Sequence, residues 1–308
     1  MTPLLERELI VVVGKGGVGR STAAAALGLA ACGSSRSVIV CETGAQGSVP
    51  AILGRRPPEP GEIVGLGDGL AATAIDPDSA LRDWMSAQVG SALSRVLGSS
   101  RSFGQFFGAA PGARELVTIT KAWELGPGRS WKRGGPTHET VVLDAPATGH
   151  GVAMLRAPRT FADLTAAGPI RNQAEKVWDL LSDPARSALV AVTLPSELPV
   201  GETLDLAAWV QETLGRDLDA VLVNRCESNG FSGPDLKAIK GAAGTVLPAE
   251  AASVAVAASR RAEGQAELIA DIEESFKGRV VVLPEFPAGT EERAIAEGIA
   301  STLERELD

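Results

Sequence analysis

Residues 11–30 read VVVGKGGVGRSTAAAALGLA and join an apolar run to an alanine-rich segment through a glycine-rich loop. The apolar run, LIVVV at 9–13, is rich in β-branched residues and predicts a strand buried on both faces of a parallel sheet. Alanine favours helix, so the segment after the loop predicts a helix that ends near Gly33. A second apolar run, SVIVCE at 37–42, follows, so residues 8–42 are expected to form one strand–helix–strand unit.

Four more apolar runs predict buried strands, at residues 139–146, 187–195, 218–226 and 278–287. Helical patterns lie between most of them, among them ELPVGETLDLAAWVQETLG at 197–215. Strands that alternate with helices indicate an α/β fold, here a mostly parallel sheet sandwiched by helices. In such folds, ligands bind at the carboxyl ends of the strands.

The whole chain, residues 1–308, is expected to form a single domain with insertions. Residues 78–135 and 152–186 carry helical patterns and glycine breaks, and we interpret them as a helical subdomain inserted into the core. An Ala- and Glu-rich excursion at 228–275 is also expected to be helical. The Pro- and Gly-rich stretch 53–69 is expected to be a surface loop.

The composition argues against several classes of protein. The net charge of −9 argues against a large nucleic-acid footprint, so no nucleic-acid partner is expected. The three cysteines, Cys32, Cys41 and Cys226, lack the spacing of a disulfide framework or a metal centre. The sequence holds no apolar run of about 18 residues, as a membrane-spanning helix needs, and its N-terminus does not resemble a signal peptide. We therefore expect a cytoplasmic protein without stable membrane insertion.

The glycine-rich loop has the spacing of a phosphate-binding loop, G-x-x-x-x-G-K-S/T, except that Arg20 replaces the lysine. Glycines let successive backbone N–H groups point at phosphates, and the N-terminus of the following helix adds positive potential. Ser21 is placed to bind a Mg²⁺ ion that bridges the phosphates. A glycine-rich turn without a ligand is the alternative. The predicted nucleotide-binding residues of the loop are Gly14, Lys15, Gly16, Gly17, Val18, Gly19, Arg20, Ser21 and Thr22.

Lys15 lies early in the loop, where its side chain cannot reach the phosphates of its own chain as the usual lysine does. This arrangement resembles the deviant Walker A loop of the ArsA, Get3, MinD, ParA and NifH class, whose early lysine reaches across a dimer interface. Three later stretches resemble the ArsA/Get3 family of ATPases, namely LDAPATGHGVAMLRAP at 143–158, VTLPSELPVGETLDLA at 192–207 and LVNR at 222–225.

Two further stretches, at 44–54 and 168–181, resemble a bacterial Get3-like subgroup, described in actinobacteria, that pairs two unlike chains. The resemblance implies ATP or ADP with Mg²⁺ as cofactors, and either a homodimer or a heterodimer with a Get3-like paralogue. The resemblance implies that Lys15 and Asp144 are catalytic and that Ser21 and Asp144 form the metal site. Further roles follow for Asn224, Arg225 and Pro284 at the nucleotide and for Thr43, Ala147, Gly149 and His150 in the switch segments. A helix cap or a core position is the alternative interpretation of His150.

Two residues depart from the family pattern. Arg20 keeps the charge of the usual lysine in a broad planar head, which could clamp a phosphate from the edge of the loop or fold out of it. Thr43 stands where the family places an aspartate that positions the attacking water. Glu42, one residue earlier, is expected to point to the other face of the strand.

Two functions therefore stay open. One is an ATPase with slow turnover, and the other is a non-hydrolysing subunit that lends Lys15 to an intact paralogue. A ParA-like partitioning factor needs a basic DNA-binding face, which the net charge does not favour. The sequence does not predict the client.

Overall fold

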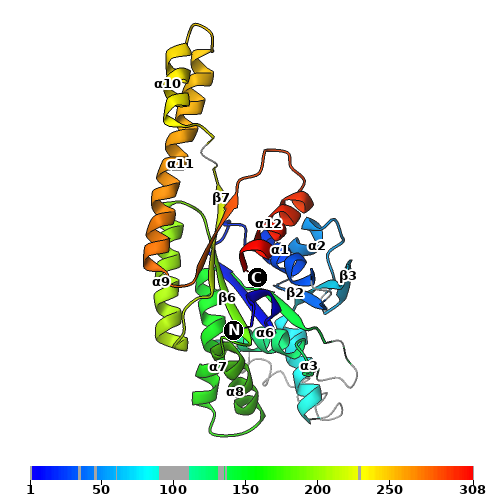
Figure 1. Cartoon of the computed structure of the whole chain (residues 1–308). Coiled ribbons are helices and arrows are strands. Elements are labelled where there is room, and N and C mark those ends of the chain that lie inside the picture. The colour runs from blue at the N-terminus through cyan, green and yellow to red at the C-terminus, as the bar shows by residue number, and fades with distance from the viewer. Residues whose placement is uncertain are drawn as a thin grey trace.

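A sheet of eight strands forms the centre of the computed structural model, which describes residues 2–33, 36–44, 47–59, 61–89, 111–130, 135, 137–227 and 230–307. Within these residues the strand order is β3-β4-β2-β5-β1-β6-β7-β8, and only the β3–β4 pair is antiparallel (Figure 1). The predicted α/β fold with a mostly parallel sheet is confirmed. The strands are β1 Leu9–Gly14, β2 Val38–Thr43, β3 Ile63–Gly67, β4 Leu70–Ile75, β5 Thr140–Asp144, β6 Ser187–Thr193, β7 Ala220–Cys226 and β8 Arg279–Pro284.

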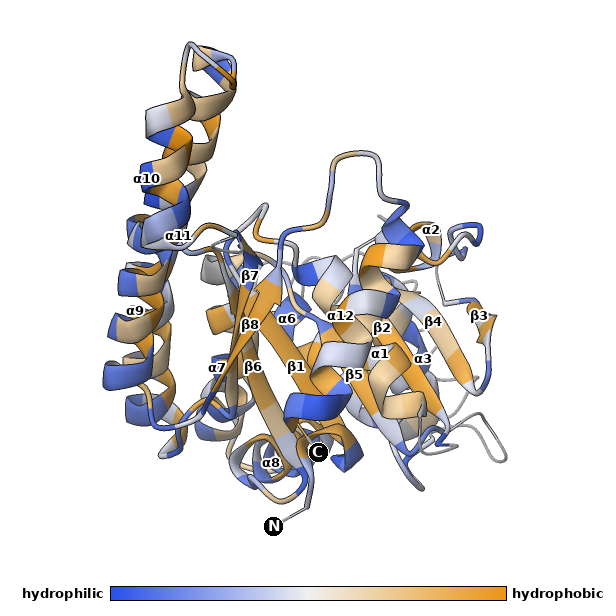
Figure 2. Ribbon diagram, turned by 45° about the horizontal axis from the view of Figure 1, so that its top comes forward, coloured by the Kyte–Doolittle hydropathy of each residue, from blue (hydrophilic) through white to orange (hydrophobic). Residues whose placement is uncertain are grey.

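Helices cover both faces of the sheet (Figures 1 and 2). One face packs against η1 Leu4–Glu6, α1 Arg20–Cys32, α2 Ser48–Ile52 and α12 Glu292–Leu307. The other face packs against α3 Pro77–Val89, α6 Ala113–Glu124, α7 Thr148–Leu164, α8 Pro169–Ser182, α9 Glu197–Leu214 and the C-terminal end of α11 Ala249–Ser275. This sandwich explains why the six inner strands are largely apolar on both sides, as their colour in Figure 2 shows.

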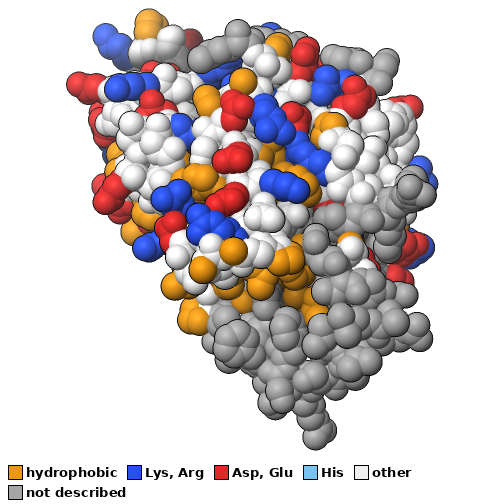
Figure 3. Space-filling view, turned by 90° about the horizontal axis from the view of Figure 1, so that it is seen from below, with side chains coloured by type: hydrophobic (Ala, Val, Ile, Leu, Met, Phe, Trp, Pro, Cys, Tyr) orange, Lys and Arg blue, Asp and Glu red, His pale blue; other side chains and the backbone are white. Residues whose placement is uncertain are grey.

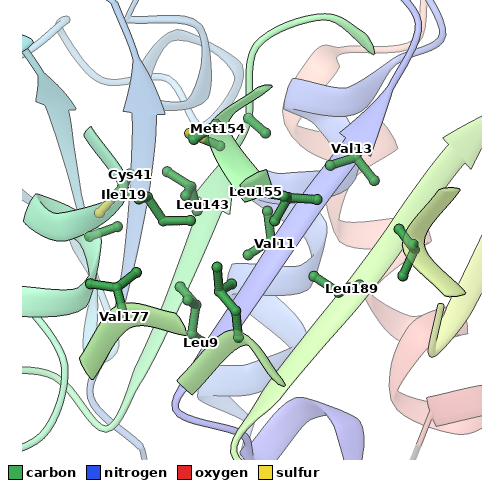
Figure 4. Close-up of a cluster of buried hydrophobic side chains, with 14 of the residues drawn as sticks. Leu9, Val11, Val13, Cys41, Ile119, Leu143, Met154, Leu155, Val177 and Leu189 are labelled. Atoms are coloured by element: carbon green, nitrogen blue, oxygen red, sulfur yellow. The ribbon is translucent and has the colours of Figure 1, made fainter. Parts of the chain in front are cut away.

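Strand β1 shows how the apolar run fixes the position of the glycine-rich loop. Leu9, Val11 and Val13 point to the α7 and α8 face, where Figure 4 shows them beside other buried side chains. Ile10 and Val12 point to the α1 face, and all five side chains are at most 1% exposed. Burying each such side chain stabilises the fold by about 1.5–3 kcal/mol. The loop therefore starts from a firmly held point at the carboxyl edge of the sheet.

The stretch 53–69 is not entirely a loop, because it contains the edge strand β3. β3 pairs antiparallel with β4, a strand that the sequence analysis does not predict. The two strands are joined by Asp68 and Gly69, whose φ angles are +47° and +85°. Asp-Gly with positive φ at both positions is the preferred two-residue hairpin turn. β4 reads LAATAI, and its alanines give a weak strand signal.

Helices make up most of the described parts of the two ranges expected to form an inserted subdomain. α3 and α6 lie within or next to the first range, and α7 and α8 occupy most of the second. These helices pack directly on the sheet, where Ile119, Leu155 and Val177 are fully buried. Residues 90–110, 131–134 and 136, also in the first range, lie outside the described residues.

The excursion at 228–275 forms a helical hairpin of α10 Gly233–Ala242 and α11, which extends beyond the carboxyl edge of the sheet (Figure 1). Ser232 and Asp235 begin α10 with a reciprocal capping box. No residue of α10 is buried, whereas the far end of α11 reaches the core through Ile272. The hairpin thus joins a solvated tip to a buried root.

The surface carries charges of both signs. Lys and Arg side chains are interspersed with Asp and Glu on the face shown in Figure 3. None of the helices in the described part of the chain combines the length and apolarity needed to cross a membrane.

Candidate nucleotide-binding site

The glycine-rich loop joins the end of β1 to the first turn of α1 at the carboxyl edge of the sheet. Gly14 has a φ of +153°, and a Cβ there would lie 2.4 Å from the carbonyl oxygen of Val192. Gly19 has a φ of +92°, and a Cβ there would lie 2.3 Å from Nδ2 of Asn224. Both positions therefore require glycine. The loop they shape leads into the N-terminus of α1, whose free N–H groups and dipole favour an anion.

Arg20 is turned inward, toward the end of β5. A Cβ built at Gly14 would lie 3.3 Å from Cδ of Arg20, so the aliphatic part of the side chain passes close to that glycine. Its Nη1 donates a hydrogen bond to the carbonyl oxygen of Ala145 and lies 4.0 Å from Oδ1 of Asp144. The guanidinium therefore occupies a third position, different from the two considered from the sequence.

Ser21 and Asp144 are in direct contact. The Ser21 hydroxyl donates a 2.7 Å hydrogen bond to Oδ2 of Asp144, whereas Oδ1 is buried without a hydrogen-bond partner in the described part of the chain. Burial raises the pKa of the Asp144 carboxyl, while the Ser21 hydrogen bond and the Arg20 charge oppose that rise. An orphaned, buried carboxylate oxygen beside a hydroxyl fits Mg²⁺, which prefers oxygen ligands.

Mg²⁺ at this position would need ligands from a bound molecule. Within the described residues, no group of three or more His, Cys, Asp and Glu side chains could hold a metal ion. Mg²⁺ in proteins is usually held by one or two carboxylates together with substrate phosphates. The donor set therefore fits a nucleotide-bound ion better than a resident one.

Lys15 points away from its own loop and binds helix α9. Its Nζ lies 2.7 Å from Oε1 of Glu202, and each side chain is about one-third exposed (36% and 34%). Glu202 belongs to the stretch at 192–207 that the sequence analysis singles out.

A cavity of about 220 Å³ lies beside the loop, between the ends of β7 and β8 and helix α12. Asn224 holds the loop directly, because its Nδ2 donates a 2.9 Å hydrogen bond to the carbonyl oxygen of Val18. Five of the predicted nucleotide-binding residues meet at the cavity, together with two residues that follow β8 and three of α12 that were not singled out from the sequence. Its lining consists of Gly19, Thr22, Asn224, Arg225, Pro284, Glu285, Phe286, Glu292, Ile295 and Ile299.

Arg225 has a backbone conformation that is rare outside glycine. Its φ is +57°, at the point where the β7–β8 pairing shifts register between Val223 and Cys226. Its N–H donates to Oδ1 of Asn224, which locks the neighbouring amide. Such strain at the end of a strand, beside a cavity, is typical of a functional site.

Three of the four predicted switch residues, Ala147, Gly149 and His150, lie at the junction of β5 and α7. Ala147 is the N-cap of α7, and its carbonyl oxygen accepts hydrogen bonds from the N–H groups of His150 and Gly151. Gly149 lies in the first turn of the helix. His150 is 79% exposed, with Nδ1 3.5 Å from Oε1 of Glu115 in α6, so it is neither a core histidine nor a side-chain cap.

Glu42 and Thr43 end strand β2 beside Asp144. The Thr43 hydroxyl donates a 3.2 Å hydrogen bond to the backbone oxygen of Asp144. Glu42 is only 3% exposed, and its Oε1 accepts hydrogen bonds from the N–H groups of Ser48 and Val49 at the start of α2. Burial raises the pKa of Glu42, and the nearby charge of Asp144 adds to that rise. Glu42 was left out of the predicted site because, one residue before Thr43, it points to the other face of the strand. The β2–β5 register places Asp144 on the face of Glu42.

The chain matches known proteins in sequence. A sequence model described as anion-transporting ATPase matches residues 7–167, which is more than half of the chain. A putative ATPase of Mycobacterium bovis and the ATPase BagA of Mycobacterium tuberculosis are each 33% identical over 228 residues, covering 70% of this chain and 64% of theirs. An ATPase GET3 of Kluyveromyces lactis is 24% identical over 253 residues, covering 70% of this chain and 71% of its own. The match thus spans less than two thirds of the length of the mycobacterial relatives. The chain belongs to the ArsA/Get3 family of anion-transporting ATPases.

Proposed function

We propose that this chain is a nucleotide-dependent, dimeric switch that binds ATP with Mg²⁺ and hydrolyses it slowly. The observation that carries the proposal is the cavity between Gly19, Asn224 and Pro284, directly beside the N-terminus of α1. A nucleotide needs a cradle for its phosphates and a pocket for its base at adjacent positions. Here the two share Gly19, so one ligand could occupy both.

Ser21 and Asp144 would hold the Mg²⁺ ion that accompanies ATP, through the Ser21 oxygen and the unpartnered Oδ1 of Asp144. When bound, Mg²⁺ supplies positive charge that neutralises the phosphates during transfer. The chain itself supplies orientation, because the loop N–H groups and the Asn224 hydrogen bond to Val18 fix the cradle before any ligand arrives.

Slow turnover follows from two side chains. Thr43 offers a hydroxyl, already bonded to the Asp144 backbone, where the family has a carboxylate for the attacking water. Arg20 is engaged with the Ala145 carbonyl and must leave it before it can contact a phosphate. Each effect leaves binding possible and lowers the rate of hydrolysis.

A second candidate function is a non-hydrolysing subunit that lends Lys15 to an intact paralogue in a heterodimer. The Lys15–Glu202 pair favours this possibility, because it places Nζ outside the loop and partly exposed. Once released from Glu202, a lysine in that position can contact a neighbouring chain rather than its own phosphates.

The test measures ATP affinity by calorimetry with Mg²⁺ and steady-state phosphate release for the wild type, Arg20→Lys and Arg20→Lys/Thr43→Asp. Wild-type binding with slow release, abolished by Lys15→Ala, supports the ATPase. Binding without release, restored in the double variant, supports the non-hydrolysing subunit. Failure of all three proteins to bind ATP would overturn both candidates.

A further inference from the structure

Glu42 and Asp144 lie side by side on one face of the sheet. Strands β2 and β5 are parallel, and Glu42 is the register partner of Asp144. Side chains alternate between faces, so Glu42 shares the face of Val40 and Asp144 that of Val142. Val40 and Val142 both pack in the core on the α1 side. Both carboxylates therefore face the helix that carries Ser21.

Each carboxylate keeps one oxygen buried and unpartnered within the described residues. Glu42 is 3% exposed and Asp144 is 7% exposed. Their other oxygens are occupied, by two N–H groups of α2 for Glu42 and by Ser21 for Asp144. Oε2 of Glu42 and Oδ1 of Asp144 have no hydrogen-bond partner. A buried acceptor without a partner is costly, so this pair of oxygens points to a missing ligand.

The nearby positive charge does not balance the two carboxylates. Arg20 contributes one charge, at 4.0 Å from Asp144, and its Nη1 is already bonded to Ala145. Two buried carboxylates on adjacent strands repel each other unless a cation lies between or beside them. Oxygen donors of this kind match a divalent cation such as Mg²⁺.

We propose that Glu42 is a second carboxylate of the cation site, which acts with Asp144 to hold the divalent ion at the phosphate loop. Helix α2 positions Glu42 for this role, because Ser48 and Val49 fix its Oε1 and leave Oε2 free. The charge that Thr43 lacks is thereby supplied by its neighbour, on the face of Asp144 and Ser21. This inference rests on the proposed function, since the ion accompanies a nucleotide.

The experiment titrates Mn²⁺ into the full chain, with and without saturating ADP, and follows free Mn²⁺ by electron paramagnetic resonance. Glu42→Gln keeps an oxygen that can accept from Ser48 and Val49 but removes the charge. We expect Mn²⁺ affinity to fall by about tenfold or more in Glu42→Gln, as in Asp144→Asn. The matched control is Glu139→Gln, just before β5 at the amino ends of the strands, far from the site. It removes one charge and keeps an acceptor for the N–H of Ser37.

Wild-type affinity in Glu42→Gln, with weakened binding in Asp144→Asn, would overturn the inference. ADP binding is measured separately in EDTA, so that loss of nucleotide binding counts against the proposed function and not against Glu42. Should Glu42→Gln fail to fold, anomalous diffraction from Mn²⁺-soaked wild-type crystals locates the ion instead. An ion bonded to Oε2 of Glu42 supports the proposal, and one that contacts Asp144 alone contradicts it.

Discussion

Lys15 and Glu202 form an ion pair between the glycine-rich loop and helix α9, with 2.7 Å between Nζ and Oε1. The pair joins residues 187 positions apart in the sequence. It keeps the lysine within its own chain, so any contact of Lys15 with a partner requires that the pair opens first.

Glu202→Gln is expected to release Lys15 at little cost in stability. A partly exposed pair contributes about 1 kcal/mol or less, so the free energy of unfolding should fall by no more than that. If Lys15 acts across an interface, nucleotide-dependent association should strengthen, as measured by sedimentation in the presence of ATP and Mg²⁺. Glu212→Gln, on the exposed side of the same helix, is the control. Equal association in the two variants would show that the pair does not restrain Lys15.

Gly19→Ala should destabilise the chain, whereas Gly16→Ala should not. A methyl group at Gly19 meets Asn224 and forces an unfavourable φ, at a cost of about 1–3 kcal/mol. A Cβ at Gly16 has no other described atom within 4 Å. Urea unfolding of the two variants measures the difference. A similar loss in both would mean that the Asn224 contact does not constrain the loop.

Asn224→Asp should lower the free energy of unfolding by about 1–3 kcal/mol, because the buried carbonyl oxygen of Val18 loses its donor. The change preserves shape but places a carboxylate at a buried position, so the cost of burying that charge adds to the lost hydrogen bond. Asn172→Asp, exposed on α8, is the control for the same chemical change at a solvated position. Calorimetric ATP affinity should fall in the first variant and stay unchanged in the second. Unaltered stability in Asn224→Asp would contradict the role of this contact.

Asp144→Asn should stabilise the metal-free chain at neutral pH. Burial holds the pKa of this carboxyl above its ordinary value of 3.8, so the folded chain binds the proton more tightly than the unfolded chain does. Ionisation therefore destabilises the fold as the pH rises from the ordinary pKa through the raised one. The penalty is complete above the raised pKa and disappears below the ordinary one.

Chemical unfolding across this pH range measures the effect. The difference between Asp144→Asn and the wild type should shrink as the pH falls toward 3.8. With Mg²⁺ and ATP at neutral pH, the wild type should be more stable than Asp144→Asn, because only the wild type gains the bound ion. A metal-free variant less stable than the wild type at neutral pH would refute the expectation.

Most of the sheet could be predicted because its strands are buried on both faces and read as unbroken apolar runs. The pair β3 and β4 was missed for two physical reasons. Half of β4 is alanine, and β3 contains Gly65 and Gly67, so each strand has only two of the β-branched residues that mark a strand. The Asp68–Gly69 turn did carry a usable signal, which the glycine-rich surroundings concealed.

The site residues could be predicted where a sequence motif fixes the backbone. They were harder to predict where the pairing of distant strands determines which side chains meet. Gly14, Gly19 and Ser21 follow from the spacing of the loop. The neighbourhood of Glu42 depends on the β2–β5 register, which no local pattern encodes. The inward turn of Arg20 depends on Ala145, 125 residues later.

Helix α11 is a long, continuous connection between the tip of the hairpin and the core. Its 27 residues span about 40 Å, from the solvated tip of the hairpin to the root, where Ile272 and Phe276 are buried. The chain then enters β8, whose last residue, Pro284, lines the cavity beside the loop. A small rotation of α11 at its root would therefore move the tip much further than the root, and the same root leads into the strand that borders the cavity.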